Sequence, residues 1–276
     1  MDWAFLSFQF LTIIPIKTKR SVSEKDIARS AMFFPLVGAF QGLILSLSCL
    51  ILNFFFSSSL TGGIIILIYV LLNGGFHLDG LSDTCDALSV KSTGNEAYDR
   101  MQRLKVMGDS TTGAIGATAI CLAILLKYLF IKELFVAGRQ FNPYFMLFLM
   151  PIFSKWAIVL SMRLGKSART DGLGNIFLQY GKIANLVFST IFTIFLSFFP
   201  YLFFLMIASQ FVNTTPGSHV WALSMFCIVE IVILYVLCHL LIRWFTSKFG
   251  GLTGDSFGAI HEVSEFIFLM IALLWR

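Results

Sequence analysis

Charged residues are scarce in this 276-residue chain, where Lys, Arg, Asp and Glu together make up 13% and hydrophobic residues make up 57%. A soluble domain carries about twice that share of charge, so the composition excludes an ordinary soluble protein. Only 15 residues are acidic, and the formal net charge is +5. In a membrane protein, topology is the first explanation of positive charge, and we expect no nucleic-acid partner.

The five cysteines show no CxxC or other metal-ligand spacing, and most lie in apolar runs. Such cysteines are typical of small buried residues and indicate no disulfide framework. Residues 1–16 are apolar, broken by Pro15, and lack the basic segment and cleavage site of a removable signal peptide. Residues 17–30 are polar and predict a short surface helix that starts near Ser23.

Seven apolar segments approach the length of about 20 residues that a membrane-spanning helix needs. They are residues 32–56, 62–76, 113–131, 143–162, 184–208, 220–242 and 259–275. We therefore predict an all-α fold: a polytopic integral membrane helical bundle with about seven spans, within a range of six to eight. The whole chain, residues 1–276, is expected to form a single domain embedded in the lipid bilayer.

Seven spans would leave four stretches on one side of the membrane: residues 17–30, 77–112, 163–183 and 243–258. Fifteen of the 20 Lys and Arg residues fall there, and Lys155 falls inside a span. The other side has Lys127, Lys132, Arg139 and Arg276. By the positive-inside rule, the richer side faces the cytoplasm.

Three carboxylates follow the second apolar segment: Asp79, Asp83 and Asp86. Their spacing of i, i+4 and i+7 places them on one stripe of a helix. Like charges on one face repel each other, whereas Mg²⁺ prefers oxygen ligands and leaves positions for water and substrate phosphate. The stripe predicts a magnesium–phosphate site on the cytoplasmic face. The alternative is a solvated acidic turn at the end of a membrane helix.

Two further stretches, one around Asp109 and one around Asp255, read Gly-Asp-Ser and then Gly-Ala-Ile at the start of a span. Glycines allow a close approach of backbone to phosphate, and a helix N-terminus favours an anion. The alternative is that Asp or Ser only caps the helix. Because both stretches lie on the side of the stripe, we favour one shared site.

Cations on the same side, Arg169 above all, are suited to neutralise phosphate. Lys155 is a costly intramembrane cation, and it indicates either a functional site or an ion pair with Glu230. Together these groups predict a diphosphate held through Mg²⁺ and a transfer of a phosphoryl or alkyl group beside it. A carboxylate or His77 would take the proton of the attacking hydroxyl. His77 reaches the stripe only if the chain bends at Gly74-Gly75.

The segment from His77 to Asp86 resembles the His-x-Asp-Gly-Leu-x-Asp-Thr-x-Asp signature of cobalamin synthase, the adenosylcobinamide-GDP ribazoletransferase family. Four other segments are similar to elements of that family in the same order: residues 10–15, 107–113, 168–174 and 251–262. They correspond to its Phe-x-Thr-x-Ile-Pro, Met-Lys-Asp-Ser, Ala-Arg-x-x-Gly-Leu-Gly and Thr-Gly-Asp patterns. The resemblance covers nearly the whole chain.

This resemblance implies that α-ribazole or its 5′-phosphate attacks the phosphate attached to cobinamide in adenosylcobinamide-GDP. The products would be adenosylcobalamin or its 5′-phosphate and GMP, in the late nucleotide-loop assembly of cobalamin biosynthesis, with Mg²⁺ as cofactor. It also implies the cytoplasmic (inner) membrane of a bacterium or archaeon. A homo-oligomer or a complex with other cobalamin-assembly enzymes is a further expectation.

The residues expected to carry the reaction fall into three groups. The catalytic residues are Asp83, Asp79 and His77. The metal ligands are Asp79, Asp83, Asp86 and Asp109. The residues that bind substrate or phosphate are Arg100, Arg103, Lys105, Ser110, Lys155, Arg169, Asp255 and Glu262.

The chain departs from the family pattern at Gly108, where Lys is usual, and at Thr112, where a basic residue is common; Lys155 replaces Arg. We expect either that Lys105 or Arg103 supplies the missing charge or that turnover is slower. The alternatives are a CDP-alcohol phosphotransferase or a prenyltransferase, whose aspartate motifs the chain does not match. A cation transporter would need acids at the midplane of several spans.

Overall fold

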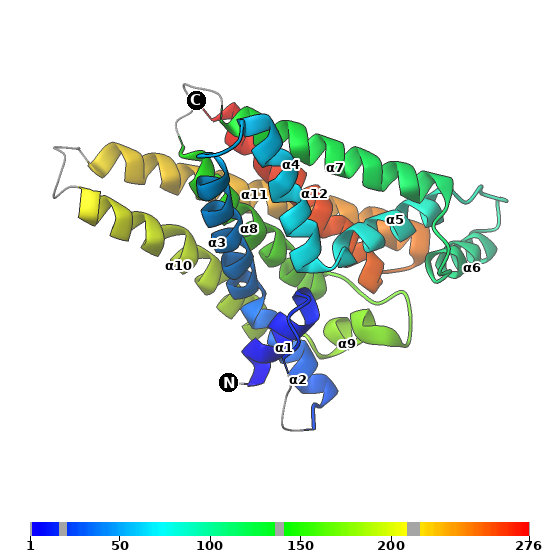
Figure 1. Ribbon diagram of the computed structural model, residues 1–276. Coiled ribbons are helices and arrows are strands. Elements are labelled where there is room, and N and C mark those ends of the chain that lie inside the picture. The colour runs from blue at the N-terminus through cyan, green and yellow to red at the C-terminus, as the bar shows by residue number, and fades with distance from the viewer. Residues whose placement is uncertain (1, 17–20, 136–140, 209–215, 276) are drawn as a thin grey trace.

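The computed structural model describes residues 2–16, 21–135, 141–208 and 216–275, and these residues form helices joined by short connections (Figure 1). The helices are α1 (Asp2–Leu11), α2 (Glu24–Ser30), η1 (Ala31–Phe33), α3 (Phe34–Leu52), α4 (Ser58–Asn73), α5 (Phe76–Ser89), α6 (Glu96–Met107), α7 (Ala114–Leu134), α8 (Pro143–Leu164), α9 (Gly172–Tyr180), α10 (Ile183–Ala208), α11 (Pro216–Phe249) and α12 (Gly254–Leu274).

Six helical segments within the described residues are long and apolar enough to cross a membrane, and the bent pair α4–α5 raises the number to seven. The prediction of a polytopic helical bundle with six to eight spans is therefore confirmed. The last span begins at Gly254, five residues before the expected position. It does so because the Thr253 hydroxyl accepts a hydrogen bond from the Ser256 N–H, which caps the helix.

Helix α8 is the centre of the bundle, and nearly all of its side chains are buried. Helix α3 packs directly against it through Gly38 and Gly42. A Cβ atom at either glycine would collide with the backbone of α8, at Pro151 or Phe148. Small residues four positions apart are a common way for two membrane helices to approach closely.

Helices α4 and α5 meet at an angle of 87°. The bend lies at Gly74 and Gly75, whose φ angles of 63° and 72° are in the left-handed region that favours glycine. The acidic stripe therefore does not continue the axis of the second span, as the apolar run had suggested. Instead, α5 turns away and packs against α7 and α12 (Figure 1).

The prediction that counts Lys127 among the cations on the less basic side of the membrane is wrong. Helix α7 continues to Leu134, and Lys127 is 5% exposed in its interior. Its ammonium group is paired with two carboxylates of α12, those of Glu262 and Glu265. A charge that is paired in this way can remain inside a bundle. The mean hydropathy of a sequence window does not show such a pair, because the partner lies on another helix.

The close contact between α3 and α8 predicts the effect of adding a side chain. Gly42→Leu should destabilise the protein by at least roughly 1–3 kcal/mol, because the new atoms collide with α8 backbone that cannot yield cheaply. The measurement is the melting temperature in detergent. Gly63→Leu is the matched control, since nothing lies within 4 Å of a Cβ there; an equal loss in both variants would contradict the packing.

Candidate active site

The three carboxylates of the predicted stripe all lie on α5. The first turns of α7 and α12 pack against this helix beside them. Asp79 is exposed, Asp83 is half-buried and Asp86 is buried. Helix α5 lies against α12 along two glycines, Gly80 of α5 and Gly258 of α12, which we call the glycine seam. A Cβ atom at Gly80 would lie 2.8 Å from the carbonyl oxygen of Asp255. The glycine seam therefore brings the first turn of α12 beside the stripe.

The seam produces a cluster of acidic side chains from two helices. Asp83 interacts electrostatically with Asp79, Asp255 and Asp86, and with one cation, Arg169. We call Asp79, Asp83 and Asp255 the acidic cluster. Its negative charges exceed the positive charge of Arg169, and its donors are all carboxylate oxygens. Such a set fits Mg²⁺, which is held by one or two carboxylates together with substrate phosphate.

Asp86 has a defined partner of a different kind. Its carboxylate accepts hydrogen bonds from the backbone N–H groups of Gly113, at 2.7 Å, and Gly116, at 2.8 Å. These are among the N–H groups at the start of α7 that have no partner within the helix. Asp86 therefore caps α7 from a neighbouring helix. Each oxygen keeps a further lone pair, and the metal-binding role of Asp86 remains a prediction.

Asp109 lies beside Asp86 rather than in the acidic cluster. Both line a cavity of about 380 Å³ between α5, α6 and α7. Hydrogen bonds from the hydroxyl and the backbone N–H of Thr111 lower the pKa of Asp109. Asp109 is therefore ionised at neutral pH. Ser110, the next residue, is exposed.

The loop after α8 places Arg169 next to the acidic cluster. Two backbone hydrogen bonds, Ala168 N–H to Leu252 O at 2.9 Å and Leu252 N–H to Lys166 O at 2.7 Å, join this loop to the segment before α12. The Arg169 guanidinium donates a hydrogen bond to Leu104 O at 3.0 Å. The loop, α6 and α12 are thus fixed relative to one another.

Arg169 also occupies the space beside Gly108, where the family pattern has a lysine. Its Nη2 atom lies 3.4 Å from the position that a Cβ of residue 108 would take. The two expected substitutes differ. Arg103 is buried and donates to Lys248 O at 3.3 Å, whereas Lys105 is exposed on α6 and interacts electrostatically with Asp109. Arg100 forms an ion pair of 3.2 Å with Glu96 on the outer face.

Three residues expected at the site lie instead in the core of the bundle. Lys155 is fully buried, Glu262 is 3% exposed and His77 is 2% exposed. The chain does bend at Gly74-Gly75, but the His77 ring packs on the ring of His261, with 3.7 Å between their centroids. The alternative of an ion pair between Lys155 and Glu230 is wrong, because neither carboxylate oxygen of Glu230 has a hydrogen-bond partner among the described residues and Lys155 lies 3.3 Å from His261 Nε2.

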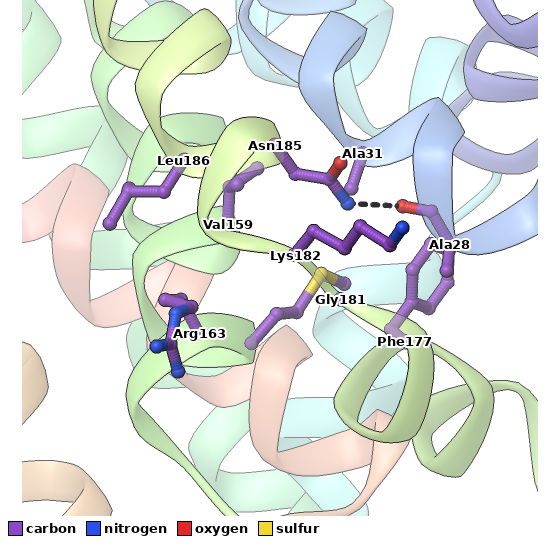
Figure 2. Close-up of a pocket in the computed structure, with 10 residues that line it drawn as sticks. Ala28, Ala31, Val159, Arg163, Phe177, Gly181, Lys182, Asn185 and Leu186 are labelled. Atoms are coloured by element: carbon purple, nitrogen blue, oxygen red, sulfur yellow. Dashed lines mark hydrogen bonds between the residues drawn. The ribbon is translucent and has the colours of Figure 1, made fainter. Parts of the chain in front are cut away.

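Two other cavities carry no comparable chemistry. The space between α2, α8, α9 and α10 measures about 10 Å³ and is closed by the hydrogen bond from Asn185 to Ala28 O, at 2.8 Å (Figure 2). A cavity of about 690 Å³ between α3, α8 and α10 has mainly apolar walls, and no charged side chain is among the described residues that line it. Arg163 and Lys182 line the first cavity, but it is no larger than about one water molecule. Neither cavity is therefore suited to bind a phosphate.

The fold and the acidic cluster define a class: a multi-span helical membrane protein with a group of carboxylates at one end of the bundle. Comparison with known families identifies it further. The model of the cobalamin-5-phosphate synthase family matches residues 4–273. The chain therefore belongs to the cobalamin-5-phosphate synthase family. No solved structure matches it.

Curated relatives carry one name, adenosylcobinamide-GDP ribazoletransferase. A protein of Thermodesulfovibrio yellowstonii is 36% identical over 98% of this chain and 95% of its own length. A protein of Escherichia coli is 32% identical over 98% of both chains. A third, from Geotalea daltonii, is 31% identical over 96% of this chain and 94% of its own length.

The capping role of Asp86 predicts a stability effect that a metal ligand would not have. Asp86→Ala leaves two N–H groups of α7 without a partner and should cost roughly 1–3 kcal/mol for each buried group. Asp86→Asn keeps one acceptor oxygen and should lose less. Melting temperatures without metal test this, with Asp79→Ala, exposed on the same helix, as control. An unchanged melting temperature for Asp86→Ala would contradict the cap.

Proposed function

We propose that this chain is an adenosylcobinamide-GDP ribazoletransferase that joins α-ribazole, or its 5′-phosphate, to adenosylcobinamide-GDP. The family match and the relatives of that name, aligned over nearly their whole length, support this activity. A hydroxyl of the ribazole forms a bond to the phosphorus attached to cobinamide. The bond from that phosphorus to the GMP phosphate breaks, and GMP leaves.

The acidic cluster is the observation that favours a site for this chemistry. Asp79, Asp83 and Asp255 would hold Mg²⁺, which when bound supplies positive charge to the diphosphate. Arg169 faces the same space and would bind phosphate oxygens. A carboxylate of the cluster that does not ligate the ion would take the proton of the attacking hydroxyl, and Asp79 is the most exposed of the three. His77 is buried away from solvent, so the carboxylate is favoured over it as the base.

The orientation of the chain in the membrane is part of the proposal. The acidic cluster lies at the end of the bundle that also carries α6, the loop of Arg169 and the end of α11. These elements hold many of the basic residues, including Arg100, Lys105 and Lys248. By the positive-inside rule, this end faces the cytoplasm of the inner membrane, where soluble nucleotide substrates are available.

The experiment is to measure GMP release from adenosylcobinamide-GDP and α-ribazole by membranes that contain the protein. Activity should require Mg²⁺ and should be abolished by a chelator. Asp83→Asn should lower turnover at least roughly 10–100-fold, the loss typical even of groups that only support a metal ligand. Glu24→Gln, a carboxylate-to-amide change on the exposed face of α2, should retain activity.

Two results would count against parts of this account. Absence of product from well-folded wild-type protein would refute the proposed reaction. Full activity of Asp83→Asn would leave the proposed reaction standing but would refute the proposal that Asp83 of α5 binds the metal.

A further inference from the structure

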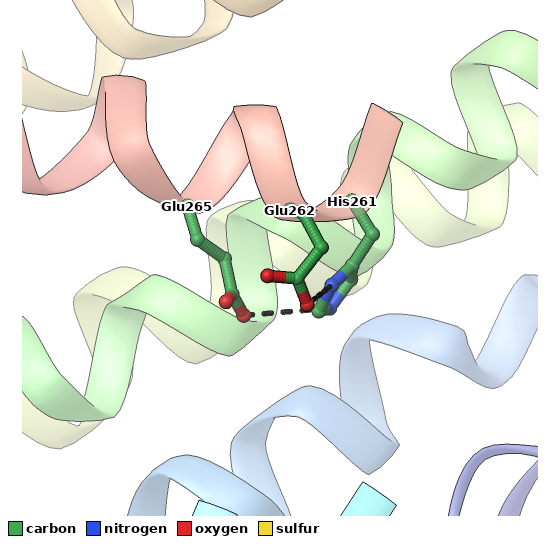
Figure 3. Close-up of side chains that lie close together, drawn as sticks. All are labelled: His261, Glu262 and Glu265. Carbon is green, nitrogen blue, oxygen red and sulfur yellow. Dashed lines mark ion pairs between the residues drawn. The ribbon is translucent and has the colours of Figure 1, made fainter. Parts of the chain in front are cut away.

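A second group of charged residues lies inside the bundle, away from the acidic cluster. Figure 3 shows His261, Glu262 and Glu265 of α12 converging on one point. The ammonium group of Lys127, from α7, lies 2.7 Å from Glu262 Oε2 and 2.5 Å from Glu265 Oε2. We call these four residues together with Lys155 the buried cluster. None of the described residues of this cluster is more than 5% exposed.

The buried cluster is balanced in charge, with two lysines and two glutamates around a histidine. Glu265 is further satisfied by α4 and α8, since its Oε1 atom accepts hydrogen bonds from the Tyr69 hydroxyl and, at 3.3 Å, from Ser154 Oγ. His261, Glu262 and Glu265 are close enough to ligate a metal ion. Lys127 already supplies the cation at that position, so a metal ion would have to displace a paired ammonium group.

The position of α12 along α5 is set by contacts outside the glycine seam, and the buried cluster supplies one of them. At Gly80 and Gly258 the two backbones approach without side chains between them. Interlocking side chains are what fix the relative position of packed helices, so the glycine seam permits closeness without setting the register. Helix α7 is tied to α5 by the hydrogen bonds of Asp86. Lys127 in turn ties α7 to two carboxylates, one turn apart, on α12.

We propose that Lys127, Glu262 and Glu265 are positioning residues that set the register of α12 and thereby place Asp255 beside Asp79 and Asp83. Glu262 lies seven residues from Asp255, which is about 10 Å along a helix. These residues therefore act on the acidic cluster through α12 and not by contact. This inference rests on the proposed function, because it concerns the metal site assumed there.

The test must separate positioning from folding. Lys127→Met alone leaves two carboxylates buried without their cation, which is strongly destabilising. The double variant Lys127→Met/Glu262→Gln removes one charge of each sign, and Glu265 and Lys155 remain as a balanced pair. Lys132→Met, on the exposed last turn of the same helix, is the matched control.

The readout is Mn²⁺ affinity, measured by electron paramagnetic resonance on the full-length protein in detergent without substrates. The double variant should melt within a few degrees of wild type and bind Mn²⁺ at least roughly 10-fold more weakly, the effect of a supporting group on a metal site. The double variant should have a lower kcat, while its KM for α-ribazole should change less. The control should match wild type. A folded double variant with wild-type Mn²⁺ affinity would overturn the inference.

A second variant covers the case in which the double variant does not fold. Lys127→Arg keeps the charge but places it farther from the α7 backbone, and it should weaken Mn²⁺ binding while the protein stays folded. Unchanged binding in this variant would contradict the inference. Wild-type protein that binds Mn²⁺ but releases no GMP would instead refute the proposed function and leave the positioning role standing.

Discussion

Repulsion between carboxylates on one face of α5 is the constraint on which the rest of the structure depends. The fold relieves it for Asp86, whose oxygens accept two N–H groups of α7. The repulsion between Asp79 and Asp83 is not relieved in this way, and the glycine seam brings a further carboxylate, Asp255, beside them. The excess negative charge remains at one end of the bundle, next to Arg169, where a divalent cation and a diphosphate would complement it under the proposed function.

The protein thus separates its charges into two regions with opposite properties. The acidic cluster is partly exposed to solvent, through Asp79 above all, and its carboxylates outnumber the one cation beside them. The buried cluster is neutral as a whole, and its ion pairs join α7 and α12 inside the bundle. The two are connected by α12, which carries Asp255 in its first turn and Glu262 two turns later. Intramembrane acids that are paired with lysine also give no support to the cation-transporter alternative.

Much of this could be predicted from the sequence because the signals are local. Apolar runs fixed the number of spans to within one, and the spacing of the three aspartates placed them correctly on one helix. The remainder depends on contacts between distant segments. Nothing near Asp86 indicates that its partners are Gly113 and Gly116. Likewise, nothing near Lys127 or Glu262 in the sequence indicates that these two side chains form an ion pair. Motif resemblance supplied the family and the reaction, which spacing alone left open.

The central claim is that carboxylates of α5 and α12 form one metal–diphosphate site. The most direct measurement is an experimental structure of the protein in a lipid nanodisc with Mg²⁺ and GDP bound. The account predicts an ion within ligand distance of Asp79, Asp83 and Asp255, with the diphosphate against Arg169. An ion and nucleotide found only in the cavity of Asp86 and Asp109, or a metal among His261, Glu262 and Glu265, would contradict it.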